Sequence, residues 1–213
     1  MLTIWGRRNS SNVQSVMWCV AELGLPYQSH DVGHKFGGND TPEFLAMNPN
    51  GLVPVLRDGD GAPLWEAGAI LRYLAASYGD DSFWPRDATA RAQIDKWAEW
   101  AKLNVAMEFN RGIFGPVVRT APKDRNDAAL TAALRTIARI LDIATRQLAD
   151  HAFLCGDAFT LADIQFGHIL YRYFEVPIAR PDHPTVRRYY DRLCGRPAYR
   201  EHVMVSYEDL RAV

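Results

Sequence analysis

The segment that decides the fold reads LVPVLRDGDGAPLWEAGAILRYLAASYG and spans residues 52–79. Two short apolar runs flank Asp58-Gly59-Asp60-Gly61, and this arrangement predicts a β-hairpin because Asp-Gly pairs suit tight turns between strands. Ile70, Leu71 and Leu74 follow at helical spacing, and a glycine ends the run. The segment therefore predicts strand, turn, strand and helix in immediate succession.

The residues before this segment alternate between strand and helix signals. Leu2–Trp5 is a short apolar strand, a helix begins near Asn12, and Tyr27–Val32 alternates like a second strand. A brief helix is expected within TPEFLAMNP, residues 41–49. The order βαβαββα predicts an α/β domain over residues 1–80, with helices packed on a small sheet of mixed direction.

No strand pattern appears from Asp87 onward, and this aspartate suits the N-cap of a long helix. Apolar residues between 130 and 148 recur at alternating spacings of four and three, which predicts an amphipathic helix whose first turn suits Pro122. The run Thr160-Leu161-Ala162-Asp163 has the spacing of a capping box, with aspartate in place of the usual glutamate. The second domain, residues 87–213, is expected to be all-helical.

Composition excludes several classes of function. The chain of 213 residues is 48% hydrophobic and 23% charged, as in ordinary globular proteins, and its net charge of -1 supplies no basic field for nucleic acid. No signal peptide and no apolar run of about 18 residues occurs, so we expect no membrane partner and a cytoplasmic protein.

Cysteine usage agrees with that compartment. Cys19, Cys155 and Cys194 lie far apart and form no C-x-x-C pair. This spacing argues against a disulfide framework, a zinc site and a two-cysteine redox centre, and it favours reduced thiols in the cytosol. We therefore expect no metal.

A polar run, Asn9-Ser10-Ser11-Asn12, separates the first strand from the first helix. Serine and asparagine are favoured N-caps because a side-chain oxygen accepts a free backbone N–H there. The same position attracts anions, since several N–H groups and the helix dipole converge on it. Both interpretations stay open from the residues alone.

Pro54 and Glu66 raise similar pairs of alternatives. Pro54 stands where a strand begins, so it marks either an edge strand or a cis peptide that presents the backbone groups of Val53 to an extended peptide. Glu66 either complements a helix dipole or receives an ammonium group while the helix N–H groups receive a carboxylate. The second reading would recognise the head of an α-amino acid.

These motifs together resemble the soluble glutathione transferases. The likeness rests on the polar loop, on FLAMNPNGLVPVL and LWEAGAILRYLAASYG, and on FTLADI in the second half, and it covers nearly the whole chain. It implies a thioredoxin-like N-terminal domain, an all-helical C-terminal domain and a homodimer. It also implies glutathione S-transferase activity of a bacterial-like type, with glutathione as co-substrate and no other cofactor.

The resemblance assigns most of the glutathione site to the first domain. It implies that Val53, before a cis Pro54, binds the cysteinyl backbone of glutathione, and that the γ-glutamyl end lies at Glu66-Ala67. The family usually has serine at the position of Ala67. Alanine keeps the backbone N–H but lacks the serine hydroxyl. A hydrogen bond to a charged group contributes roughly 1.5–3 kcal/mol, so we expect glutathione affinity to fall by about tenfold or more.

The same resemblance places the thiol beside the polar loop. Ser10 falls where serine-type classes keep the activating residue, Ser11 is the alternative, and Asn9 or Asn12 adds a hydrogen-bond donor. The glycyl carboxylate needs a cation after the second strand, for which Lys35 is preferred over His34 because lysine is charged at pH 7. The thiolate then attacks an electrophilic carbon.

The electrophile pocket is expected against the long helix that begins near Asp87. Its candidate residues are two aromatics, Phe109 and Phe114, and two arginines, Arg111 and Arg119. Core packing is the alternative for the aromatics, whereas arginines facing the cleft would suit a small anionic electrophile such as a haloacid.

Two other functions fit the same motifs. One is a non-catalytic binding module with the transferase fold, which the missing hydroxyl at Ala67 favours. The other is a glutathione-dependent isomerase, which uses the same thiolate but regenerates glutathione.

Overall fold

A computed structural model describes residues 1–212 and begins with a four-stranded sheet. Its strands are β1 (Leu2–Trp5), β2 (Tyr27–His30), β3 (Val55–Asp58) and β4 (Leu64–Trp65), in the order β2-β1-β3-β4. β1 pairs parallel with β2 and antiparallel with β3, and β3 pairs antiparallel with β4. The predicted mixed direction of the sheet is therefore confirmed.

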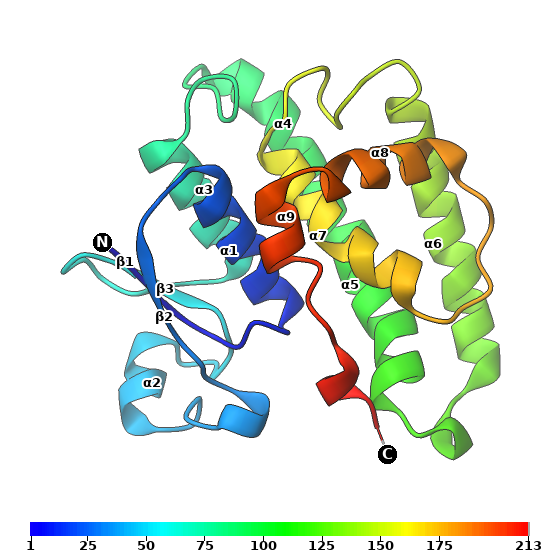
Figure 1. Cartoon of the computed structure of the whole chain (residues 1–213), viewed down its shortest axis with the longest axis horizontal. Helices are drawn as coiled ribbons and strands as arrows, with labels where there is room; N and C mark the ends of the chain where they lie inside the picture. The colour runs from blue at the N-terminus through cyan, green and yellow to red at the C-terminus, as the bar shows by residue number, and fades with distance from the viewer. Residues whose placement is uncertain (213) are drawn as a thin grey trace.

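Three helices pack on this sheet: α1 (Ser11–Glu22), α2 (Pro42–Met47) and α3 (Ala67–Tyr78). In Figure 1, α1 and α3 lie between the sheet and the helical domain, whereas α2 lies on the far side at the lower left. Together with the strands they give the predicted order βαβαββα. The second strand ends two residues earlier than expected, because the chain turns at Gly33 into a short 3-10 helix, His34–Phe36.

The rest of the described chain is helical. Its elements are α4 (Ala88–Trp100), α5 (Met107–Phe109), α6 (Asp127–Gln147), α7 (Leu161–Glu175), α8 (Pro184–Cys194) and α9 (Pro197–His202), with 3-10 turns at Pro122–Asp124 and Glu208–Leu210. Asp87 caps α4 as predicted, since its side chain accepts the N–H of Ala90 at 2.8 Å. None of the helices within residues 1–212 combines the length and apolar character that a bilayer crossing needs.

The predicted start of α6 is wrong. Pro122 lies in its own 3-10 turn, and α6 begins at Asp127. The helix starts there because the side chain of Asn126 accepts the N–H of Ala129 at 2.9 Å, and asparagine is a much stronger N-cap than the alanine before Pro122.

Two stretches of wide π-helical turns, Ala101–Ala106 and Asn110–Arg119, continue α4 and flank α5. Such turns shift the register of a helix, and they often occur at functional sites. Here they change which side chains between residues 101 and 119 face the first domain.

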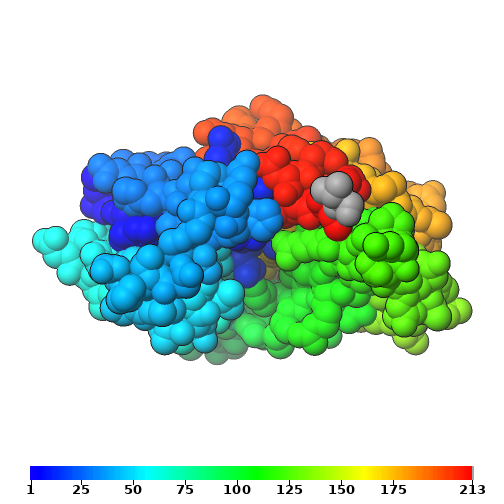
Figure 2. All heavy atoms as spheres, turned by 90° about the horizontal axis from the view of Figure 1, so that it is seen from below, coloured from blue at the N-terminus to red at the C-terminus, as the bar shows by residue number. Residues whose placement is uncertain are grey.

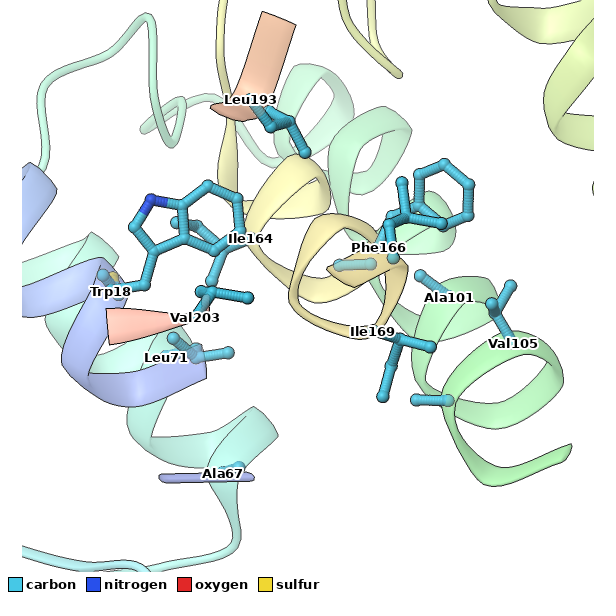
Figure 3. Close-up of a cluster of buried hydrophobic side chains, with 14 of the residues drawn as sticks. Trp18, Ala67, Leu71, Ala101, Val105, Ile164, Phe166, Ile169, Leu193 and Val203 are labelled. Atoms are coloured by element: carbon cyan, nitrogen blue, oxygen red, sulfur yellow. The ribbon is translucent and has the colours of Figure 1, made fainter. Parts of the chain in front are cut away.

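The two domains meet where α1 crosses α7. A Cβ atom on Gly167 would lie 2.5 Å from Cδ1 of Leu193 and 2.9 Å from the indole of Trp18, so only glycine permits this approach. The hydroxyl of Tyr199 donates to the Gly167 carbonyl at 2.9 Å and closes the contact from the other side. Figure 3 shows Trp18 and Leu193 beside α7, together with the buried Ile164.

The predicted capping box at the start of α7 is confirmed. Asp163 is fully buried, and its carboxylate accepts the N–H of Thr160 at 2.8 Å and the N–H of Leu154 at 2.9 Å. The hydroxyl groups of Thr160 and Tyr189 also donate to it, at 3.1 and 2.8 Å. One carboxylate thus ties α7 to α8 and to the loop before it.

Replacing this carboxylate should destabilise the protein strongly. Asp163→Asn replaces one carboxylate oxygen with an NH₂ group, so two of the four donors lose their acceptor, and it should lower the free energy of unfolding by about 3 kcal/mol. Urea denaturation followed by circular dichroism measures the change. Asp157→Asn is the matched control, because Asp157 is exposed and accepts one long bond, at 3.4 Å. Equal stability of the two variants would contradict the structural role of Asp163.

Candidate active site

The loop between β1 and α1 is short and tightly packed. Gly6 donates its N–H to the carbonyl of His30 at 2.9 Å, and a Cβ on Gly6 would lie 2.5 Å from Cγ2 of Val13. Ser10 occupies the N-cap position of α1, but its side chain makes no capping bond. Its hydroxyl therefore stays available to another group, which removes the capping interpretation for this residue.

A pocket of about 310 Å³ opens between the two domains beside this loop. It is lined by Arg7, Ser10, Ser11, Asn12, Gly33, His34, Asn39, Gly51, Leu52, Val53, Asn110 and Arg119. Figure 2 shows the hollow between the light-blue and cyan first domain and the green helical residues, with dark-blue atoms of the N-terminal segment at its floor. Both predicted serines thus line a cavity at the domain boundary.

The Val53-Pro54 peptide is cis. Val53 lines the pocket, and within residues 1–212 its backbone groups bond to no other backbone group. The turn before it is held by two amides, since Asn39 donates to the Gly51 carbonyl at 2.8 Å and Asn48 to the Leu52 carbonyl at 2.7 Å. This geometry leaves the N–H and C=O of Val53 able to pair with an extended peptide.

The pocket is positively charged. Arg7 and Arg119 line it, and neither forms an ion pair with a carboxylate among residues 1–212. Partial burial lowers the pKa of Arg7, and the nearby charge of Arg119 lowers it further. Both effects mean that the two guanidinium groups gain from a bound anion.

Glu66 and Ala67 stand at the start of α3. Glu66 has φ 69° and ψ 113°, a conformation that non-glycine residues rarely adopt and that is often found at ligand clamps. Ala67 is buried and, being alanine, offers no hydroxyl beside the first-turn N–H groups of α3.

Lys102, from the first π-helical turn, lies close to this helix start. Its ammonium donates to Oδ1 of Asn12 at 2.8 Å. Burial lowers the pKa of Lys102, and the negative charges of Glu66 and Glu99 oppose that change. Lys102 also lines a second pocket of about 320 Å³ with Asn12, Ala106, Met107, Asn110 and Arg111.

The structure separates the four residues predicted for the electrophile pocket. Phe109 and Phe114 are 0% and 1% exposed, and their rings pack together at 6.2 Å between centroids. They belong to the core of the helical domain and do not line the pocket. Arg111 lines the second pocket, and only Arg119 reaches the pocket beside Ser10.

The structure favours His34 over Lys35 as the pocket residue after β2, whereas the sequence favoured Lys35. His34 lines the pocket, whereas the ammonium of Lys35 pairs with the carboxylate of Asp209 at 2.5 Å. The pairing draws Lys35 toward the C-terminal segment. Of the two candidates after β2, His34 is therefore the one that faces the cavity.

Sequence reasoning missed Arg7, Lys102 and Asn110 as site residues. Arg7 stands two residues after the end of the first strand, and that position is a usable signal because loops after strands often carry binding residues. Lys102 and Asn110 stand on π-helical turns, and no pattern in the sequence distinguishes those turns from ordinary helix.

The sequence matches a known family of proteins. Residues 1–76 match the family described as "Glutathione S-transferase, N-terminal domain", and residues 108–197 match "Glutathione S-transferase, C-terminal domain". Over 206 residues the chain is 40% identical to "Glutathione S-transferase GstB" of Escherichia coli (strain K12), covering 96% of this chain and 99% of that protein. It is 32% identical over 211 residues to "Glutathione S-transferase 3" of Zea mays, with 95% and 93% covered.

Solved structures agree with these relatives. The theta class glutathione S-transferase of Xanthomonas axonopodis pv. citri, crystallised with glutathione bound, superposes with a TM-score of 0.90 at 45% identity, covering 96% of this chain and 98% of that one. Fold, domain order and sequence thus point the same way: this chain belongs to the glutathione S-transferase family, as an enzyme of the bacterial-like type.

Proposed function

We propose that this transferase joins glutathione to a small anionic electrophile, such as a 2-haloacid. The observation that carries the proposal is the pair of guanidinium groups, Arg7 and Arg119, in the pocket that Ser10 lines. Each lacks a carboxylate partner within the described chain, so a bound carboxylate would supply one. A neutral electrophile would leave both charges without a partner in a partly buried site.

Glutathione is proposed to lie along the first domain. Its cysteinyl backbone pairs with the free N–H and C=O of Val53, which places the thiol toward Ser10. The glycyl carboxylate extends toward His34, and the γ-glutamyl end extends toward Glu66 and the first N–H groups of α3. The relative from Xanthomonas axonopodis pv. citri, a theta class transferase with glutathione bound, supports this arrangement through its shared fold.

The reaction is a nucleophilic substitution. The glutathione thiol loses its proton to solvent, and the Ser10 hydroxyl and the N-terminus of α1 favour the resulting thiolate. The sulfur forms a bond to the carbon that bears the halogen, and halide leaves with the bonding electron pair. Arg119 and Arg7 hold the substrate carboxylate throughout, so the product is a thioether acid.

Ser10 is expected to control the thiol. Ser10→Ala should raise the pKa of bound glutathione by about one to two units, because a hydrogen bond to a charged group contributes roughly 1.5–3 kcal/mol. The ultraviolet absorbance of the bound thiolate, followed against pH, measures the shift. Ser11→Ala is the matched control on the neighbouring residue, whose hydroxyl accepts a long bond from Asn110 at 3.5 Å. A larger shift in Ser11→Ala would give the role to Ser11.

Arg119 is expected to select for negative charge. Arg119→Gln should lower kcat/KM for bromoacetate by about tenfold to a hundredfold while changing the value for neutral bromoacetamide by less than about twofold. Halide release in the presence of glutathione measures both rates. Arg135→Gln, at an exposed position of α6, is the control for loss of one surface charge. Equal losses with the acid and the amide would refute the proposed substrate class.

Lys102 is proposed to offset the hydroxyl that Ala67 lacks, since its ammonium lies where a γ-glutamyl carboxylate would come near the start of α3. Restoring the hydroxyl should then add to the existing attraction. Ala67→Ser should tighten glutathione binding by about tenfold, as measured by isothermal titration calorimetry. Ala69→Ser, exposed in the same helical turn, is the control. Unchanged affinity in Ala67→Ser would place the γ-glutamyl end elsewhere.

Compartment and assembly follow from the same proposal. The three free thiols, Cys19, Cys155 and Cys194, suit the reducing cytoplasm, where glutathione is abundant. A homodimer is proposed because large apolar side chains such as Leu103 and Met107 are 53% and 42% exposed on the helical domain. Covering them against a second copy would remove that apolar surface from water.

A further inference from the structure

Arg172, near the end of α7, is an arginine in an unusual environment. It is 1% exposed, and its Nη2 donates to the carbonyl of Asn9 at 2.7 Å. Its Nε and Nη1 have no hydrogen-bond partner, and no carboxylate among residues 1–212 forms an ion pair with it. Burying an unpaired charge costs free energy, so stability of the core does not explain why an arginine stands at this position.

Arg172 belongs to a group of three positive charges, two of which, Arg7 and Arg119, line the pocket. Its guanidinium lies 4.5 Å from the centroid of the Phe114 ring, and that of Arg119 lies 5.4 Å from the same centroid. An aromatic face attracts cations, so the buried Phe114 ring favours a position beside it for both groups. Burial, followed by the charges of Arg119 and Arg7, lowers the pKa of Arg172 to about 9.

Two tyrosines near Arg172 would raise its pKa if they were ionised, but both are neutral at pH 7. Ionised Tyr207 and Tyr171 would raise its pKa, but burial raises the pKa of each phenol above its ordinary value. Both tyrosines therefore stay neutral at pH 7 and do not compensate the guanidinium. Arg172 is therefore positively charged at pH 7.

Arg172 also holds the peptide that leads into the reactive loop. The Asn9 carbonyl that it binds belongs to the peptide bond joining Asn9 to Ser10. The N–H of that peptide donates to the Arg7 carbonyl at 3.1 Å, and the Ser10 carbonyl accepts the N–H of Gln14 at 2.9 Å. Ser10 is thus fixed on both sides, and the only one of these three bonds that comes from the helical domain is the one made by Arg172.

We propose that Arg172 is a positioning residue for thiol activation: it fixes the Asn9-Ser10 peptide and adds a buried positive charge beside those of Arg7 and Arg119, which favours the glutathione thiolate. The inference rests on the proposed function, because it concerns the ionisation of bound glutathione. It adds a residue from α7 that touches neither glutathione nor the electrophile.

Two substitutions separate the charge from the hydrogen bond. Arg172→Gln keeps an N–H donor for the Asn9 carbonyl but removes the charge, whereas Arg172→Lys keeps both a donor and a charge. The midpoint of the thiolate absorbance of bound glutathione, followed against pH, should shift upward by about one pH unit in Arg172→Gln, which is about a tenfold smaller ionisation constant of the bound thiol. Arg172→Lys should restore the wild-type midpoint to within about 0.3 unit.

Arg180→Gln is the matched control. Arg180 also donates to backbone carbonyls, those of Phe174 and Val176, and its guanidinium lies 5.5 Å from the centroid of the Tyr173 ring. It makes no hydrogen bond to the loop before α1, so removing its charge should leave the thiolate midpoint unchanged. Where Arg172→Gln does not fold, Arg172→Met fills a similar volume without charge or donor and should shift the midpoint upward by at least as much.

The outcomes are distinct. An upward shift in an uncharged variant with recovery in Arg172→Lys supports the inference. A folded, glutathione-binding uncharged variant with the wild-type midpoint would overturn it, as would equal shifts in Arg172→Gln and Arg172→Lys. Wild-type protein that shows no bound thiolate at any pH would overturn the proposed function first and this inference with it.

Discussion

The contact between the indole of Trp18 and the backbone of Gly167 sets the relation between the two domains. Trp18 stands in the middle of α1 and Gly167 in the middle of α7, and no side chain separates them. Packed interiors do not yield to an added methyl group without movement. A larger residue at position 167 would therefore displace α7. Arg172, which stands on α7, would then move away from the loop that precedes α1.

Unpaired positive charges gather near one pocket, although the protein as a whole is almost neutral. The net charge is only -1, and other arginines are paired: Arg72 contacts Asp95 at 2.7 Å, and Arg196 contacts Glu22 at 2.6 Å. Arg7, Arg119 and Arg172 have no such partner within residues 1–212, although they stand on three separate segments. A field concentrated in one cleft attracts an anion without making the whole surface basic.

Features encoded by neighbouring residues could be predicted from the sequence. The order of strands and helices, the Asp87 cap and the capping box at Thr160 depend on short-range patterns, and the structure confirms them. The cis peptide before Pro54 stayed open from the residues alone and followed from the resemblance. Pro122 misled because a proline suits both a helix start and a separate turn.

Features that depend on register or on distant contacts could not be predicted. The wide turns between residues 101 and 119 shift the helix phase, so a regular helical projection gives no way to place Phe114 in the core and Arg119 at the pocket. His34 and Lys35 are adjacent, and the ion pair with Asp209 decides between them from the other end of the chain. In the proposed site the first domain supplies backbone groups, hydroxyls and the charge of Arg7, whereas the charges of Lys102, Arg119 and Arg172 come from the helical domain. Glutathione affinity and thiol activation should therefore depend on how closely the domains pack, and a separated first domain would keep the peptide-binding edge while losing most of the field that holds the thiolate.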